Sequence, residues 1–323
     1  QPNTKRGQPS RNPVSTKLGE DQTVCFVEKV APYMRIAHVG LPVFPAILST
    51  HGGAIQRRIW ELARLQARLG HEVVVYSIGQ ETRRLRIEGV ELQYVRCETP
   101  LPLRHWEYQF RIMMFLKSKR PSSQVVHFHS HPEGAFMTRF IPGSKVLSYD
   151  EYHFRRPSNG IIYRIYQNLL KKFDLLLPVS DYCLQESRRF WSLDSSRMRV
   201  LFNGVAREQF FPNEEAGKAE KLALGLEKRI LLYVGRICRQ KGSDLLIEAF
   251  NLLQRRRNDV QLVMAGPIAQ FGNMDDPEGW ADKIGLAGGR YLGAVEEQRL
   301  AAVYNLADIF VMPTRHAEMF GMA

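Results

Sequence analysis

Two cations, Arg236 and Lys241, follow a short hydrophobic run in the stretch YVGRICRQKGSDLLIEAF, residues 233–250. The pattern predicts a strand that ends at Gly235 and a helix that begins near Gly242. Glycine lets the backbone approach a ligand, and a helix start offers N–H donors and a positive dipole. An arginine fork and a lysine point charge beside such a start suit a diphosphate. The alternative is two ordinary surface cations.

A second candidate site closes the chain, in MPTRHAEMFGMA, residues 312–323. A hydrophobic strand runs into a polar turn, and Glu318 and the pair Phe320–Gly321 follow. This order is typical of a loop that enters a helix whose backbone N–H groups face a ligand.

Two histidines lie in the predicted strand QVVHFH, residues 124–129. Because side chains alternate along a strand, His127 and His129 point the same way, and only His129 reaches the rim. The alternative for His129 is a hydrogen-bonded structural histidine.

Elements that position these residues alternate between short β-rich runs and amphipathic helical runs. This alternation predicts an α/β protein with parallel sheets covered by helices. We expect two Rossmann-like domains that face a central cleft, residues 34–205 and 206–323, after a disordered or non-native tail, residues 1–33. Ligands of such sheets bind at the carboxyl ends of the strands.

Bulk composition is that of an ordinary globular protein, with 323 residues, 44% hydrophobic and 24% charged. No apolar run approaches the ~18 residues that would suggest a membrane span. The four cysteines are scattered without a C-x-x-C pair, so neither a zinc site nor a disulfide framework is indicated. A reducing cytoplasm is therefore the expected compartment.

Charge is concentrated in the first predicted domain. Residues 34–205 carry 25 Lys and Arg against 14 Asp and Glu, an excess of +11, whereas residues 206–323 carry 15 against 16. An anionic acceptor or an anionic membrane surface would explain this asymmetry. A generic solubilising surface is the alternative. A nucleic-acid partner is not expected, because no recognition motif interleaves basic and aromatic residues.

Several motifs, in order along residues 34–323, resemble those of family-4 retaining glycosyltransferases with the GT-B fold. The pattern G-R-x-x-x-x-K-G from Gly235 is similar to the most specific of them. The others are THGGAIQRRIWELARLQARLGHEVVVYS, VVHFHSHPEG, LLLPVSDY, RVLFNGVAREQFFP and ADIFVMPTRHAEMFGMA. Ala206 stands where the family usually has Asp, and Thr314 stands where Ser is common.

The resemblance implies a nucleotide-diphosphate sugar held mainly by the second domain and an acceptor held mainly by the first. Arg236 and Lys241 would bind the diphosphate, His129 would lie near the sugar ring, and Glu318 would bind sugar hydroxyls. Backbone N–H groups would contact the donor or acceptor at the positions that we group as donor-binding: Gly52, Gly53, Gly235, Phe320 and Gly321. No cofactor and no metal are expected.

The expected reaction is transfer of a hexose-type sugar with retention of configuration, in glycan, glycolipid or cell-envelope polysaccharide synthesis. Acceptors of the family include glycans, lipid-linked molecules and small molecules. Peripheral contact with the inner face of an anionic membrane is a further expectation. The family's second carboxylate would fall at position 326, beyond the chain, which predicts a C-terminal truncation and a poorly active chain.

Two alternatives remain at this point. A nucleotide-sugar epimerase uses the same two-domain fold, although the E-x-F-G segment beside G-R-x-x-x-x-K-G favours transfer. A catalytically incomplete fragment is the other alternative.

Overall fold

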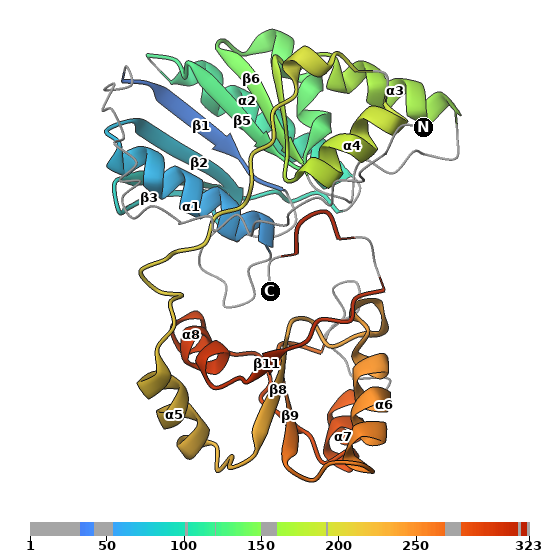
Figure 1. The fold of residues 1–323 in the computed structure, drawn as a ribbon. Coiled ribbons are helices and arrows are strands. Elements are labelled where there is room, and N and C mark those ends of the chain that lie inside the picture. The colour runs from blue at the N-terminus through green and yellow to red at the C-terminus, as the bar shows by residue number, and fades with distance from the viewer. Residues whose placement is uncertain are drawn as a thin grey trace, which may run out of the picture. The chain divides into compact units, whose positions relative to one another are not determined.

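The computed structural model describes residues 33–41, 54–100, 103–119, 121–149, 160–191, 193–268, 279–315 and 318–321. The predicted tail up to residue 32 lies outside the described residues, and so do the predicted donor-binding residues Gly52 and Gly53. The remainder is α/β, as the sequence predicts, with two sheets that are each described below (Figure 1).

The first sheet has seven strands in the order β3-β4-β2-β1-β5-β6-β7. Every neighbouring pair is parallel except the β3–β4 hairpin around Glu88 and Gly89, which is antiparallel as expected. The strands are β1 (Arg35–Val39), β2 (Glu72–Ile78), β3 (Arg83–Ile87), β4 (Val90–Val95), β5 (Val125–His129), β6 (Ser144–Tyr149) and β7 (Leu175–Pro178).

Helices cover both faces of this sheet, because alternate residues of its strands point to opposite sides. Val73 and Val75 pack with Ile59 of α1, whereas Val74 and Tyr76 belong to a separate cluster with residues of the other helices. These helices are α1 (Ala54–Arg68) on the first face, and α2 (Leu103–Ser118), α3 (Gly160–Leu170) and α4 (Asp181–Phe190) on the second.

The second sheet has four parallel strands in the order β10-β9-β8-β11. They are β8 (Arg229–Val234), β9 (Val260–Ala265), β10 (Arg290–Tyr291) and β11 (Ile309–Phe310). Four helices alternate with them: α5 (Glu214–Ala223), α6 (Ser243–Gln254), α7 (Trp280–Leu286) and α8 (Glu297–Asn305). Separate apolar clusters lie around α6 with α7 and around α8, so both faces are covered.

One expected strand, residues 199–203, does not form. Arg199 and Leu201 donate to the carbonyls of Leu176 and Pro178, at 3.0 and 2.9 Å, but only Met198 forms an isolated bridge. A parallel ladder needs donors from both strands, and Pro178 has no N–H with which to return a bond. The segment therefore runs beside β7 without becoming a strand.

Among the described helices, none combines the length and the apolar character that crossing a bilayer requires.

Candidate functional site

The loop after β8 has the form that the sequence predicts. Gly235 follows the strand and donates its N–H to the carbonyl of Ala265 at 2.9 Å. A short 3-10 turn, Arg239–Lys241, then leads through Gly242 into α6. The hydroxyl of Tyr233 donates to the Arg236 carbonyl at 2.7 Å, which fixes the backbone where the first cation leaves the strand.

Gly242 has a structural reason to be glycine. Its φ is +75°, in the left-handed region, and a Cβ built on it would overlap the carbonyl of Pro313. This close approach brings the loop after β8 against the segment that leaves β11. The absence of a side chain at Gly242 therefore lets the two predicted motifs meet.

Lys241 and Glu318 form an ion pair between their Nζ and Oε1 atoms. Their side chains are 19% and 13% exposed, so the pair is largely shielded from water. The guanidinium of Arg236, half-buried in the same loop, has no partner among the described residues. The structure thus pairs two of the four predicted catalytic residues, Lys241 and Glu318, and places a third, Arg236, on the same loop as Lys241.

Two further contacts join this loop to the facing segment. The N–H of Arg315 donates to the Gln240 carbonyl at 3.1 Å. The Arg315 guanidinium also contacts both carboxylate oxygens of Asp244, at 2.5 and 2.6 Å. The loop that carries Lys241 and the segment that carries Glu318 are therefore joined by a backbone contact and a side-chain contact in addition to the ion pair.

The segment after Glu318 bends at Met319 and Phe320, and Gly321 has a φ of +75°. The Ser180 hydroxyl donates to the Met319 carbonyl, and the rings of Phe320 and Phe202 lie 6.4 Å apart. The predicted helix start at Phe320–Gly321 falls at the end of the described residues, where only this bend is seen.

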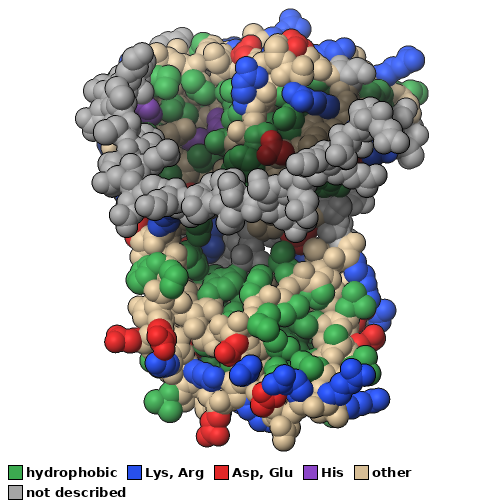
Figure 2. Space-filling view, in the orientation of Figure 1, with side chains coloured by type: hydrophobic (Ala, Val, Ile, Leu, Met, Phe, Trp, Pro, Cys, Tyr) green, Lys and Arg blue, Asp and Glu red, His purple; other side chains and the backbone are tan. Residues whose placement is uncertain are grey.

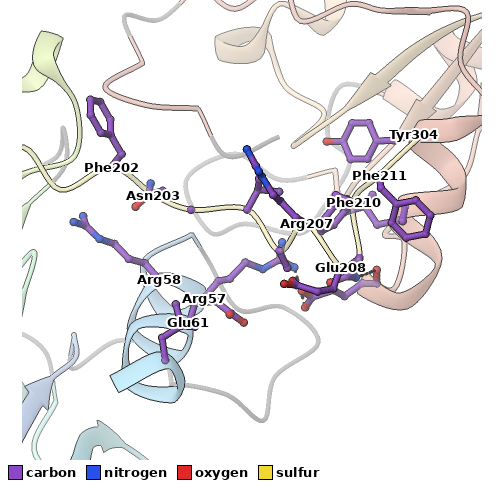
Figure 3. A pocket seen from close by; sticks show the side chains of 18 of the residues that line it. Arg57, Arg58, Glu61, Phe202, Asn203, Arg207, Glu208, Phe210, Phe211 and Tyr304 are labelled. Atoms are coloured by element: carbon purple, nitrogen blue, oxygen red, sulfur yellow. Dashed lines mark hydrogen bonds and ion pairs between the residues drawn. The ribbon is translucent and has the colours of Figure 1, made fainter. Parts of the chain in front are cut away.

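A pocket of about 980 Å³ includes three of the predicted donor-binding residues, Gly235, Phe320 and Gly321. Its other walls come from α1, from residues 202–212 and from α8. Figure 3 shows Arg57, Arg58 and Glu61 on α1 and Arg207 and Glu208 on the connecting segment. Five arginines against three glutamates line the pocket, which therefore favours an anion.

His129 lies elsewhere, as the last residue of β5, in a cluster with His38 of β1 and His127. All three side chains are buried, with exposures of 1%, 0% and 5% respectively. Burial lowers the pKa of each of them, that of His38 to about 4. Within the described part of the chain, no hydrogen bond or ion pair joins His129 to Arg236, Lys241 or Glu318.

Three residues that no sequence motif indicates, His38, Gln66 and Ser148, make the hydrogen bonds of this cluster. His38 Nδ1 lies 2.9 Å from His129 Nε2, and His38 Nε2 lies 2.7 Å from Oε1, the side-chain amide oxygen of Gln66. Ser148 Oγ lies 2.5 Å from His127 Nε2. The sequence did offer one indication that His38 has a special role, because it is a polar residue within the apolar run RIAHVG, residues 35–40. Histidine side chains are visible in a recess on the face drawn in Figure 2.

The three histidines are also the one group of potential metal ligands found among the described residues, with one nitrogen of each lying within 4.8 Å of the others. Neutral imidazoles are the form that binds a transition metal. A nearby cation opposes such binding, because Arg58 lowers the pKa values of His127 and His129 through its charge. The expectation that the protein holds no metal stays a prediction.

Two family models match the chain. "Glycosyltransferase Family 4" matches residues 52–209, and "Glycosyl transferases group 1" matches residues 215–323. A D-inositol 3-phosphate glycosyltransferase from Segniliparus rotundus is 29% identical over 42% of this chain and 30% of its own length. Mannosylfructose-phosphate synthase from Agrobacterium fabrum is 27% identical over 95% of this chain and 76% of its own length. The chain spans about a third of the length of the first curated relatives that it matches.

Solved structures show the same fold. Anabaena Alr3699/HepE, in complex with UDP and glucose, has a TM-score of 0.67 and 14% identity over 90% of this chain and 76% of its own. WaaG, a glycosyltransferase involved in lipopolysaccharide biosynthesis, has a TM-score of 0.61 and 20% identity, over 87% and 75% of the two chains. The predicted GT-B type of α/β fold is therefore confirmed.

Proposed function

We propose that this chain, which belongs to the group 1 and family 4 glycosyltransferases, is the sugar-transferring part of an enzyme that uses a nucleotide-diphosphate sugar. The observation that carries the proposal is the Lys241–Glu318 ion pair, which lies on the loop after β8 that also carries Arg236. The epimerase alternative finds no support among the relatives and structures described above.

Arg236 supplies the charge for the donor's diphosphate, because its guanidinium is the uncommitted cation of this loop among the described residues. The positive charge of Lys241 is already balanced by the Glu318 carboxylate before a donor binds. An arriving diphosphate competes for the ammonium and releases the Glu318 carboxylate to accept hydrogen bonds from sugar hydroxyls. Stabilising the leaving diphosphate lowers the barrier to breaking the glycosidic bond.

Retention of configuration and a front-face route belong to this proposal, as does the absence of a cofactor and a catalytic metal. The proposed site is cytoplasmic, and no nucleic acid takes part. Glycans, lipid-linked molecules and small molecules are the acceptor classes. An anionic acceptor fits the excess of +11 on residues 34–205. An anionic acceptor is also consistent with the names of two relatives, which mention D-inositol 3-phosphate and mannosylfructose phosphate.

The test is a donor and acceptor screen in which mass spectrometry follows the release of the free nucleotide and the mass of the product. UDP-glucose is the first donor, since it is soluble and its hydrolysis is easily measured. Proton NMR of the product's anomeric centre then reads the configuration. Donor cleavage without a heavier acceptor, or inversion at that centre, would contradict the proposal.

A second candidate function is contact with an anionic membrane, which one surface favours. On α2, Leu103, Trp106, Phe110 and Met114 recur at helical spacing and are each 49–58% exposed. Arg104, Arg111 and Lys117 lie on the same helix. Apolar side chains beside cations suit the interface of an acidic bilayer.

Sedimentation with acidic and with neutral vesicles tests this second function. Phe110→Gln with Met114→Gln should weaken binding to acidic vesicles, and added salt should weaken it further. Leu222→Gln is the matched control, because Leu222 is 83% exposed on α5. Equal binding to both vesicle types at all salt concentrations would leave only a solubilising role for the cations.

A further inference from the structure

A chain of hydrogen bonds runs from α1 into the first sheet. It begins at Oε1 of the Gln66 side-chain amide, passes through both ring nitrogens of His38, and ends at His129 Nε2. The distances are 2.7 Å and 2.9 Å. His38 is fully buried and His129 is 1% exposed, so water does not interrupt the chain.

The direction of each bond follows from its first member. The Gln66 amide oxygen Oε1 only accepts, so His38 carries its proton on Nε2. Burial lowers the pKa of His38 to about 4, against a smaller opposite effect of the Gln66 bond, so the ring is neutral near pH 7. A neutral imidazole has one protonated nitrogen, and His38 Nδ1 is therefore an acceptor. His129 must donate to it from Nε2.

This assignment leaves the lone pair of His129 on Nδ1. That atom is buried and has no hydrogen-bond partner within the described part of the chain. A buried acceptor without a donor is unfavourable, and a ligand hydroxyl that reached it would satisfy it. A second acceptor, such as a phosphate oxygen, would instead be repelled.

We infer that Gln66 and His38 set the tautomer of His129, so that its Nδ1 accepts a hydrogen bond from a hydroxyl of the transferred sugar. The inference rests on the proposed function and makes Gln66 and His38 positioning residues. His127 stands outside the chain, because its Nε2 is engaged by Ser148 and its ring only stacks on that of His129, with centroids 4.1 Å apart.

The competing use of the same three rings is a metal site. A metal would have to displace the bond between His38 Nδ1 and His129 Nε2, the two atoms that point at each other. The metal would also add positive charge to a buried site where the Arg58 cation already disfavours it, since the charge of Arg58 helps to lower the pKa of His129. The hydrogen-bonded chain is therefore the favoured arrangement, and metal binding is an outcome of the test.

Nitrogen-15 NMR of the histidine-labelled chain at pH 7 tests the inference without substrate. His129→Gln and His38→Gln identify the signals. The expected spectrum shows both rings protonated on Nε2 and His129 Nδ1 unprotonated. A His129 ring protonated on Nδ1 would overturn the inference, as would zinc that survives EDTA and shifts all three rings. Should those variants unfold, substitution of the other seven histidines by glutamine identifies the same signals by elimination.

Two matched variants then separate positioning from packing. Gln66→Met keeps the volume but removes the acceptor, and should give His129 a mixture of tautomers. Ser148→Ala, in the same cluster, should leave the His129 tautomer unchanged. Adding UDP-glucose should move the His129 Nδ1 signal in the wild type, and Gln66→Met should lower kcat about tenfold with little change in KM. An active enzyme whose kcat is unaffected by Gln66→Met would refute the inference while leaving the proposed function intact.

Discussion

The loop after β8 and the histidine cluster of β1 and β5 hold polar groups in opposite ways. The loop carries full charges, with an ion pair that is 13–19% exposed and a guanidinium without a partner among the described residues. The cluster carries neutral rings that are buried and linked to one another. Both occur at or near the carboxyl end of a parallel strand, as expected for ligand sites in such sheets.

This difference indicates two kinds of recognition. A diphosphate is a concentrated charge, and cations at a helix start stabilise it over a range of orientations. A sugar hydroxyl is neutral, so its recognition depends on which nitrogen holds a proton and where that nitrogen points. Burial lowers the pKa of His129 and keeps its ring neutral, which makes the directional role available.

Loss of the unpaired cation should have the largest effect. Arg236→Ala should lower transfer by ~10²–10³-fold, the scale for removing one charge-stabilising group. Arg229→Ala is the matched control, since Arg229 is an exposed cation at the opposite end of the same strand. Steady-state kinetics with a donor found in the screen measures both. Equal activities of the two variants would show that Arg236 does not bind the diphosphate.

The Lys241–Glu318 pair should separate stability from transfer. Lys241→Met leaves the Glu318 carboxylate shielded and unpaired, so the melting temperature should fall. Adding Glu318→Gln should restore most of that loss, because the stranded charge is gone, while transfer stays at least tenfold low. Thermal melts and kinetics on the two variants provide the check. Recovery of transfer in the double variant would mean that the pair only supports the fold.

Much of the fold was predictable because local patterns determine it. The alternation of β-rich and amphipathic runs located the seven strands of the first sheet and the loop from Gly235 to Gly242. Residues 199–203 have the local pattern of a strand, and Pro178 of the neighbouring strand β7 prevents the ladder from forming. That information lies in another segment of the chain, where a local pattern cannot show it.

The candidate site was predictable as a set of residues but not as a set of contacts. Motif order indicated Lys241 and Glu318, yet their pairing joins residues 77 positions apart. Strand alternation placed His127 and His129 on one face of the sheet. It could not show that His38 lies opposite His127 on the neighbouring strand, or that Gln66 of α1 reaches it. Such contacts depend on sheet order and on helix packing.

Gly242 should affect the loop through its backbone. Gly242→Ala places a Cβ at a φ of +75°, which costs ~1–2 kcal/mol, and forces it against the Pro313 carbonyl. We expect a lower melting temperature and weaker nucleotide binding. Gly225→Ala is the control, since the φ of Gly225 is +63° but nothing lies within 4 Å of the position that the new Cβ would take. Equal destabilisation by both changes would show that the contact with Pro313 does not matter.

The histidine cluster should make stability depend on pH. The pKa of His38 falls from 6.5 to about 4 on folding, so the unfolded chain binds more protons between these values. Stability must then fall as the pH drops from 6.5 towards 4. His38→Gln should flatten this part of the curve of melting temperature against pH, whereas His71→Gln, outside the cluster, should not. Parallel curves for wild type and His38→Gln would contradict the buried neutral state.

The smallest effect should come from the exposed pair beside the loop. Arg315 is 42% exposed where it meets Asp244, and pairs of this kind contribute ~1 kcal/mol or less. Arg315→Ala keeps the backbone bond from residue 315 to the Gln240 carbonyl, which holds the loop against the segment after β11. Transfer should therefore fall by less than tenfold, and the loss should shrink in high salt, where the wild-type pair is screened. A loss as large as that of Arg236→Ala would mean that the Arg315 side chain itself meets the donor, and that the loop's charge extends beyond its unpaired guanidinium.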